Sequence, residues 1–115
     1  MSALATSTAA VQPYRSVGAL LIAASRITGV SPAMIRGKDR TPNIVRIRDA
    51  VIWCARTAHG VSQSHLGRAL DDRDHSTIRI AFNRAEQRIN RDGDFALLCG
   101  AITDAQLVCD MATPA

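Results

Sequence analysis

Aromatic residues are scarce in this sequence. Phe, Trp and Tyr make up 3% of its 115 residues, although hydrophobic residues as a group make up 47%. Because so few large rings are available, the core must be built from aliphatic side chains, mostly Ala, Leu, Ile and Val. β-Sandwiches and barrels draw on aromatic and β-branched residues, and no stretch here shows convincing strand alternation. We therefore predict one small all-α domain with tails, built from about five to six helices.

The sequence also lacks the marks of a metal site, a disulfide framework or an exported protein. Its three cysteines, Cys54, Cys99 and Cys109, include no CxxC pair, and with the three histidines they give no zinc-ligand spacing. We expect buried, reduced thiols and no bound metal. No run approaches the ~18 apolar residues of a membrane span, and no basic region precedes an apolar one at the N-terminus. We therefore expect a cytoplasmic protein without membrane contact.

Catalytic and nucleotide-binding motifs are missing as well. There is no GxxxxGK[ST] run and no glycine-rich loop after a strand, so we expect no cofactor. A Cys–His nucleophile pair is the one enzymatic arrangement that remains formally open. We predict that the protein is not an enzyme and has no catalytic residues.

Positive charge is concentrated in one part of the chain. Residues 1–91 hold all 14 Lys and Arg residues against six acids, whereas residues 92–115 hold four acids and no Lys or Arg. A basic body with an acidic tail suits binding to a polyanion. Thirteen of the 14 basic residues are Arg, which makes bidentate contacts with phosphate and guanine. Composition is therefore compatible with a nucleic-acid partner, although a GC-rich genome would also enrich Arg.

One stretch, residues 66–90, predicts a short helix, an acidic turn and a longer basic helix. Asp74 is placed to cap the longer helix, because its carboxylate can accept the backbone N–H of Ser76 or Thr77. Apolar residues then recur at three- and four-residue steps and make a stripe that must face a core: Ile78, Ala81, Phe82, Ala85 and Ile89. A buried stripe with a polar N-terminal end is typical of a helix-turn-helix recognition helix.

Residues 73–78 read Arg-Asp-His-Ser-Thr-Ile. This run closely resembles the signature Arg-Asp-His-Thr-Thr-Val of the DNA-binding domain of the bacterial replication initiator DnaA. The resemblance extends back through residues 66–67 and 46–48, and covers roughly residues 17–91. It implies an all-α, Trp-repressor-like domain that binds double-stranded DNA.

The resemblance also implies which residues contact DNA. Bases in the major groove would be read from the start of the recognition helix, by Arg73, Asp74, His75, Ser76 and Thr77. Arg40, in a basic loop at residues 36–42, would enter the minor groove, although that loop alone also fits a solvated connector. Phosphate contacts are expected from Arg46, Arg48, Arg56 and Arg79, and from Gln63 and Ser64 at a helix N-terminus. Asp49 could instead draw Arg48 into an ion pair.

Periodic apolar residues predict the remaining helices, at about 14–28, 32–36, 44–58, 63–70 and 95–111. The expected N-caps of the last four are Ser31, Asn43, Ser62 and Asp94. The turn residues Asp71 and Asp72 stand where the family commonly has glycine, and aspartates can take left-handed conformations there, less easily than glycine. They also place negative charge beside the presumed DNA surface.

Three parts are expected along the chain: a disordered arm at 1–13, the DNA-binding domain at 14–91, and a C-terminal helix and tail at 92–115. The last helix either completes the core or serves self-association or a protein partner. We predict sequence-specific binding to an initiator-box-like duplex without the ATPase module, with a role in replication initiation or transcription. The alternative is a protein-interaction module that retains the fold with weakened DNA binding.

Overall fold

The chain forms six α-helices in the part that the computed structural model describes, residues 13–112, with side-chain surroundings described for residues 17–105. The predicted all-α fold is confirmed. The helices are α2 (Pro13–Thr28), α3 (Pro32–Arg36), α4 (Pro42–Ala58), α5 (Gln63–Ala69), α6 (His75–Arg91) and α7 (Gly93–Ala112). The arm expected at residues 1–13 lies outside the described residues, apart from Pro13 at the start of α2.

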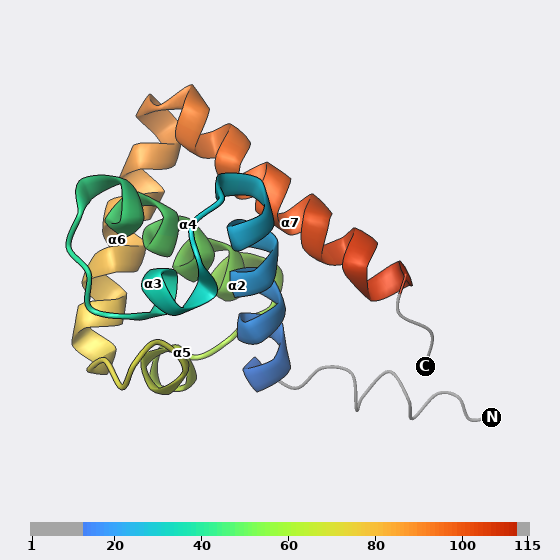
Figure 1. Ribbon diagram of the computed structural model, residues 1–115. Coiled ribbons are helices and arrows are strands. Elements are labelled where there is room, and N and C mark those ends of the chain that lie inside the picture. Colours follow the sequence, from blue (N-terminus) through green and yellow to red (C-terminus); the bar gives the residue numbers. More distant parts are fainter. Residues whose placement is uncertain (1–12, 113–115) are drawn as a thin grey trace.

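Helix α4 lies at the centre of the fold and packs against each of the other five helices (Figure 1). It is buried around most of its circumference, through Ile44, Ile47, Ala50, Val51, Ile52, Cys54 and Ala55. A helix buried around most of its circumference is characteristic of a core position rather than a surface one. The helix therefore serves as the scaffold on which α2, α6 and α7 are placed.

The start of α4 differs from the prediction. The helix begins at Pro42, two residues before the expected first residue, and Thr41 rather than Asn43 holds the N-cap position. Proline suits the first helical position, because its φ is preset and it has no N–H to leave unpaired. The expected Asn43 cap was therefore wrong, and the Thr-Pro pair marks the boundary.

The link between α2 and α3 contains the predicted N-cap Ser31. Gly29 ends α2 with φ of 79°, a left-handed conformation that favours glycine. Ser31 then caps α3, since its Oγ accepts the Met34 N–H at 3.2 Å, and Pro32 takes the first helical position. Ile27, near the end of α2, is 42% exposed and stays outside the core.

The first half of α7 completes the core. Phe95, Cys99 and Ile102 are buried with residues of α2 and α4 in one hydrophobic cluster. The helix begins at Gly93, and Asp92 rather than Asp94 supplies the capping carboxylate: its Oδ1 accepts the N–H groups of Asp94 at 3.1 Å and Phe95 at 3.2 Å. The later part of α7 extends past α2, away from α6 (Figure 1).

The other predicted features concern the thiols and the membrane. Cys54 and Cys99 are buried free thiols, and the side chain of Cys109 lies outside the described residues. No helix among the described residues is both long and apolar enough to cross a lipid bilayer.

Candidate DNA-binding site

Helices α5 and α6 form the predicted helix-turn-helix, and both expected N-caps are present. The Oγ of Ser62 accepts the His65 N–H at 3.1 Å, which starts α5. The carboxylate of Asp74 accepts the Ser76 N–H at 3.0 Å, which starts α6, and it also accepts the Ser76 hydroxyl. These hydrogen bonds favour the charged form and hold the pKa of Asp74 below its ordinary value.

The turn between the two helices has the backbone that its aspartates were expected to adopt. Asp71 and Asp72 have φ of 60° and 59°, and both side chains are exposed. The turn also passes close to Gly67 of α5, where an added Cβ would lie 2.1 Å from the Arg73 carbonyl oxygen. The turn is therefore the close neighbour of Gly67, and the Arg73 N–H also donates to the Gly67 carbonyl at 2.7 Å.

The first two turns of α6 present polar side chains to solvent. His75, Thr77 and Arg79 are exposed and Ser76 is half-buried, whereas Ile78 and Ala81 face the core. The predicted stripe is confirmed along the rest of the helix, with Ala85 buried and Phe82 and Ile89 partly buried against the core. The helix therefore offers hydrogen-bonding groups on its outer face while its inner face fixes it to α4.

The exposed face of α6 continues beyond the residues that were predicted to contact DNA, the last of which is Arg79. Ile80 is 59% exposed, and Asn83 is exposed as well. Ile80 follows Ser76 by four residues and Thr77 by three, and Asn83 follows Ile80 by three, which is the spacing that defines one face of a helix. That spacing was a usable signal, and it places an apolar side chain on the same face as the hydrogen-bonding ones.

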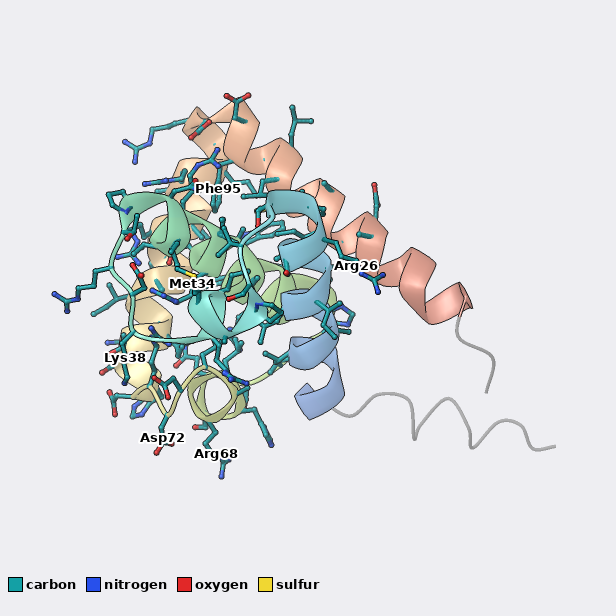
Figure 2. All side chains as sticks on the ribbon, in the orientation of Figure 1. Arg26, Met34, Lys38, Arg68, Asp72 and Phe95 are labelled. Atoms are coloured by element: carbon teal, nitrogen blue, oxygen red, sulfur yellow. The ribbon has the colours of Figure 1, made fainter. Side chains whose placement is uncertain are left out.

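A groove of about 590 Å³ separates the loop at residues 37–41 from the start of α6. Lys38 and Arg40 line it on the loop side, and Asp72, Asp74 and Thr77 line it on the other. Figure 2 shows Lys38 and Asp72 in the same lower part of the molecule, beside the helix-turn-helix. The basic loop and the recognition helix are thus neighbours, although 35 residues separate Arg40 from His75 in the sequence.

The geometry argues against the phosphate role expected for Arg48. Its side chain is only 6% exposed, and its guanidinium donates to the carbonyl oxygens of Ile35 at 2.7 Å, Asp39 at 2.8 Å and Met34 at 3.4 Å. Burial is the main cause that lowers its pKa. The ion pair with Asp49, considered from the sequence, does not form, because Asp49 pairs with Arg84 of α6.

Arg73 is engaged inside the molecule in the same way. Its Nη1 donates to the carbonyl oxygens of Leu70 at 2.6 Å and Arg36 at 2.7 Å, and its Nη2 donates to the Gly37 carbonyl oxygen. Desolvation lowers its pKa. The direct contact with a guanine edge or a phosphate that was expected of Arg73 therefore competes with three internal hydrogen bonds.

The other arginines of α4 are partly engaged as well. Arg46 stacks its guanidinium over the Phe95 ring at 5.7 Å and lies 3.8 Å from the Asp92 carboxylate. Arg56 donates to the Val61 carbonyl at 3.1 Å and covers the Phe82 ring at 5.5 Å. Both side chains remain partly exposed, in contrast to Arg48.

The remaining predicted contacts lie at the surface. Arg40 and Arg79 are exposed, as is Ser64 at the N-terminal end of α5, and Gln63 beside it is half-buried. The structure therefore brings Arg40 and Thr77 to one groove. Arg48 and Arg73 also line that groove, but they serve as part of its wall.

These elements define a helix-turn-helix domain within the six helices of residues 13–112. A family described as the bacterial dnaA protein helix-turn-helix matches residues 20–84, more than half of the chain. The chain belongs to this family, and the resemblance inferred from residues 73–78 is confirmed.

Curated proteins named chromosomal replication initiator protein DnaA are similar to the chain. The chromosomal replication initiator protein DnaA of Wolinella succinogenes is 32% identical over 74 residues, which cover 64% of this chain and 17% of that protein. The protein of the same name from Streptococcus pyogenes serotype M1 is 34% identical over 64 residues, or 56% of this chain and 14% of that protein. The chain thus spans less than a fifth of the length of either relative. No solved structure matches the chain significantly.

Proposed function

We propose that this protein binds double-stranded DNA at a site like the initiator box, with the N-terminal turns of α6 in the major groove. The observation that carries the proposal is that His75, Thr77 and Arg79 are exposed at the start of a helix whose Ile78, Ala81 and Ala85 side chains are buried against the core. The major groove is wide enough to admit an α-helix that presents exposed polar side chains. The family assignment supports the same reading.

Base reading is assigned to the first turn of α6. The imidazole of His75 and the hydroxyl of Thr77 supply donors and acceptors, and the Thr77 methyl can contact the methyl group of thymine. The hydroxyl of Ser76 is already bonded to Asp74, so these two residues act together, the carboxylate accepting from a base amino group as well as capping the helix. Each good base contact is worth about 1–3 kcal/mol of discrimination.

Backbone and minor-groove contacts come from the surroundings of this helix. Arg40 is proposed to enter the minor groove, whose negative potential attracts arginine. Arg79, the exposed part of Arg46 and Arg56, and Gln63 and Ser64 are proposed to hold phosphates. With Arg48 and Arg73 withdrawn, about four cationic contacts remain, which predicts a slope of roughly −4 for log K against log salt.

Occupation of a box by this domain would compete with a full-length initiator for the same site. We therefore propose regulation of replication initiation or transcription as the process in which the protein acts. The proposal predicts that unlabelled protein displaces a full-length DnaA from a box-containing duplex in proportion to its own affinity. A protein that binds the box without displacing DnaA would contradict this role while leaving DNA binding intact.

A second candidate function is a protein-interaction module. Leu97 of α7 is 73% exposed, and Asp71 and Asp72 put negative charge beside the proposed DNA face. Contiguous exposed apolar patches mark partner surfaces, and Leu97 is the most exposed large hydrophobic side chain among the described residues. This candidate predicts self-association or partner binding that is lost in Leu97→Ser and lacks the salt slope expected for DNA.

The deciding experiment is fluorescence anisotropy with a duplex that carries an initiator-type box and with a scrambled duplex, each at two salt concentrations. Preference for the box with a slope near −4 is expected. Equal, salt-sensitive binding to both duplexes would overturn the sequence-specific part of the proposal. Absence of binding to both would favour the interaction module.

A further inference from the structure

The C-terminal end of α3 is held by two arginines. Arg48 of α4 takes the carbonyl oxygens of Met34 and Ile35, and Arg73 from the helix-turn-helix takes those of Arg36 and Gly37. A helix end normally leaves its last carbonyls to solvent or to a local cap. Here every one of these four consecutive carbonyls receives a guanidinium donor from a distant part of the chain.

The same two arginines extend their contacts to the neighbouring segments. Arg48 also donates to the Asp39 carbonyl at 2.8 Å, and Arg73 also donates to the Leu70 carbonyl at 2.6 Å. Arg48 thus fixes both sides of residues 36–38 to α4. Arg73, which directly precedes the cap residue of α6, fixes the same segment to the end of α5.

The loop side chains are left outside this arrangement. Lys38 and Arg40 are exposed, and both line the groove that faces the start of α6. The backbone beneath them is restrained, while the side chains remain available. A basic arm ordered in advance binds with a smaller loss of conformational entropy than a mobile one.

We propose that Arg48 and Arg73 are positioning residues: they lock the basic loop at residues 37–41 beside the recognition helix, so that Arg40 meets the minor groove when α6 enters the major groove. Neither arginine contacts DNA in this arrangement. The inference rests on the proposed DNA binding, but the restraint of the loop itself is a property of the free protein.

The test is a double-mutant cycle. Arg73→Lys keeps the charge but cannot donate to three carbonyls in a planar fork. Arg40→Ala should weaken box binding roughly tenfold in the wild-type background and less than about threefold in the Arg73→Lys background. Arg79→Ala should weaken binding by the same factor in both backgrounds, because Arg79 is not on the loop.

Arg68→Lys, an exposed arginine on α5, serves as the matched control and should leave the effect of Arg40→Ala unchanged. Additive effects of Arg73→Lys and Arg40→Ala would overturn the proposal. The proposal would also be overturned if Arg73→Lys reduced the effect of Arg79→Ala on binding as much as it reduces the effect of Arg40→Ala. General destabilisation of the protein would then explain both results. Should Arg73→Lys unfold, Arg73→Gln retains two planar donors and takes its place.

A second measurement separates this inference from the proposed function. Brief trypsin treatment of the free protein should cleave after Arg36, Lys38 and Arg40 several times faster in Arg73→Lys than in Arg68→Lys. If Arg73→Lys is cleaved faster but the wild-type protein binds no DNA, the loop restraint is upheld and the proposed function is overturned. Unchanged cleavage in a folded variant would overturn the restraint itself.

Discussion

Arg84 of α6 and Asp49 of α4 form a two-point ion pair. The Arg84 Nε lies 2.7 Å from Asp49 Oδ2, and its Nη2 lies 2.9 Å from Oδ1. The carboxylate is buried, the guanidinium is about half exposed, and hydrogen bonding to Asp49 raises the pKa of Arg84. The pair joins the recognition helix to the central helix, two turns beyond the residues proposed to read DNA.

Removal of Arg84 should lower the stability of the protein more than removal of the Asp49 charge. Arg84→Met should lower the free energy of unfolding by about 3 kcal/mol, because the buried carboxylate loses its donors. Asp49→Asn should cost less, about 1–2 kcal/mol, because water can solvate the exposed guanidinium. Urea unfolding would measure both, with Arg79→Met as a surface control within about 0.5 kcal/mol of wild type. Equal losses for the two variants would contradict this asymmetry.

Gly67 should not tolerate a side chain. Gly67→Ala would place a Cβ 2.1 Å from the backbone oxygen of Arg73, so the turn must shift, at a cost of roughly 3 kcal/mol. Gly18→Ala in α2 is the matched control, since nothing lies within 4 Å of the added Cβ. It should stabilise the protein by about 0.5–1 kcal/mol through helix propensity. Thermal unfolding would compare them, and a Gly67→Ala variant as stable as wild type would refute the close approach.

The cap of α6 should make stability depend on acid pH. The pKa of Asp74 lies below its ordinary value of 3.8 because of hydrogen bonds from Ser76, so its stabilising effect is complete above that value. It is lost as pH falls through the lower pKa of the folded protein. Asp74→Asn keeps a capping acceptor but cannot titrate. The difference in melting temperature between wild type and this variant should therefore shrink below pH 4; a difference that grows would contradict the assignment.

Negative charge in the turn should weaken DNA binding. Asp72 lines the groove opposite Lys38 and Arg40, and Asn accepts the same left-handed backbone without the charge. Asp72→Asn should bind the box duplex several-fold more tightly at low salt, with a smaller gain at high salt. Asp104→Asn on α7 is the control and should change little. An unchanged affinity for Asp72→Asn would mean that the turn lies away from DNA.

Local features of this fold were readable from the sequence. The caps at Ser62 and Asp74 and the left-handed Asp71 and Asp72 depend on neighbours within a few residues. The start of α4 was also readable, because Pro42 is best placed at a first helical position, but Asn43 was preferred in its place. Short-range chemistry therefore accounts for most helix boundaries.

The roles of the arginines could not be predicted from short-range sequence patterns. Arg73 bonds to carbonyls 36 and 37 residues away, Arg48 to carbonyls up to 14 residues away, and Arg84 to a carboxylate 35 residues away. Backbone carbonyl acceptors carry no sequence signal, because every residue has one. An arginine that binds phosphate and one that binds a helix end look alike until the fold brings the acceptor to it.

The central claim is that the first turn of α6 reads bases, and the most direct test is the ratio of affinities for box and scrambled duplexes. His75→Ala should reduce this ratio at least tenfold and leave binding to the scrambled duplex nearly unchanged. Gln87→Ala, exposed three turns further along the same helix, should leave the ratio at its wild-type value. A His75→Ala protein that retains the full preference for the box would contradict the claim.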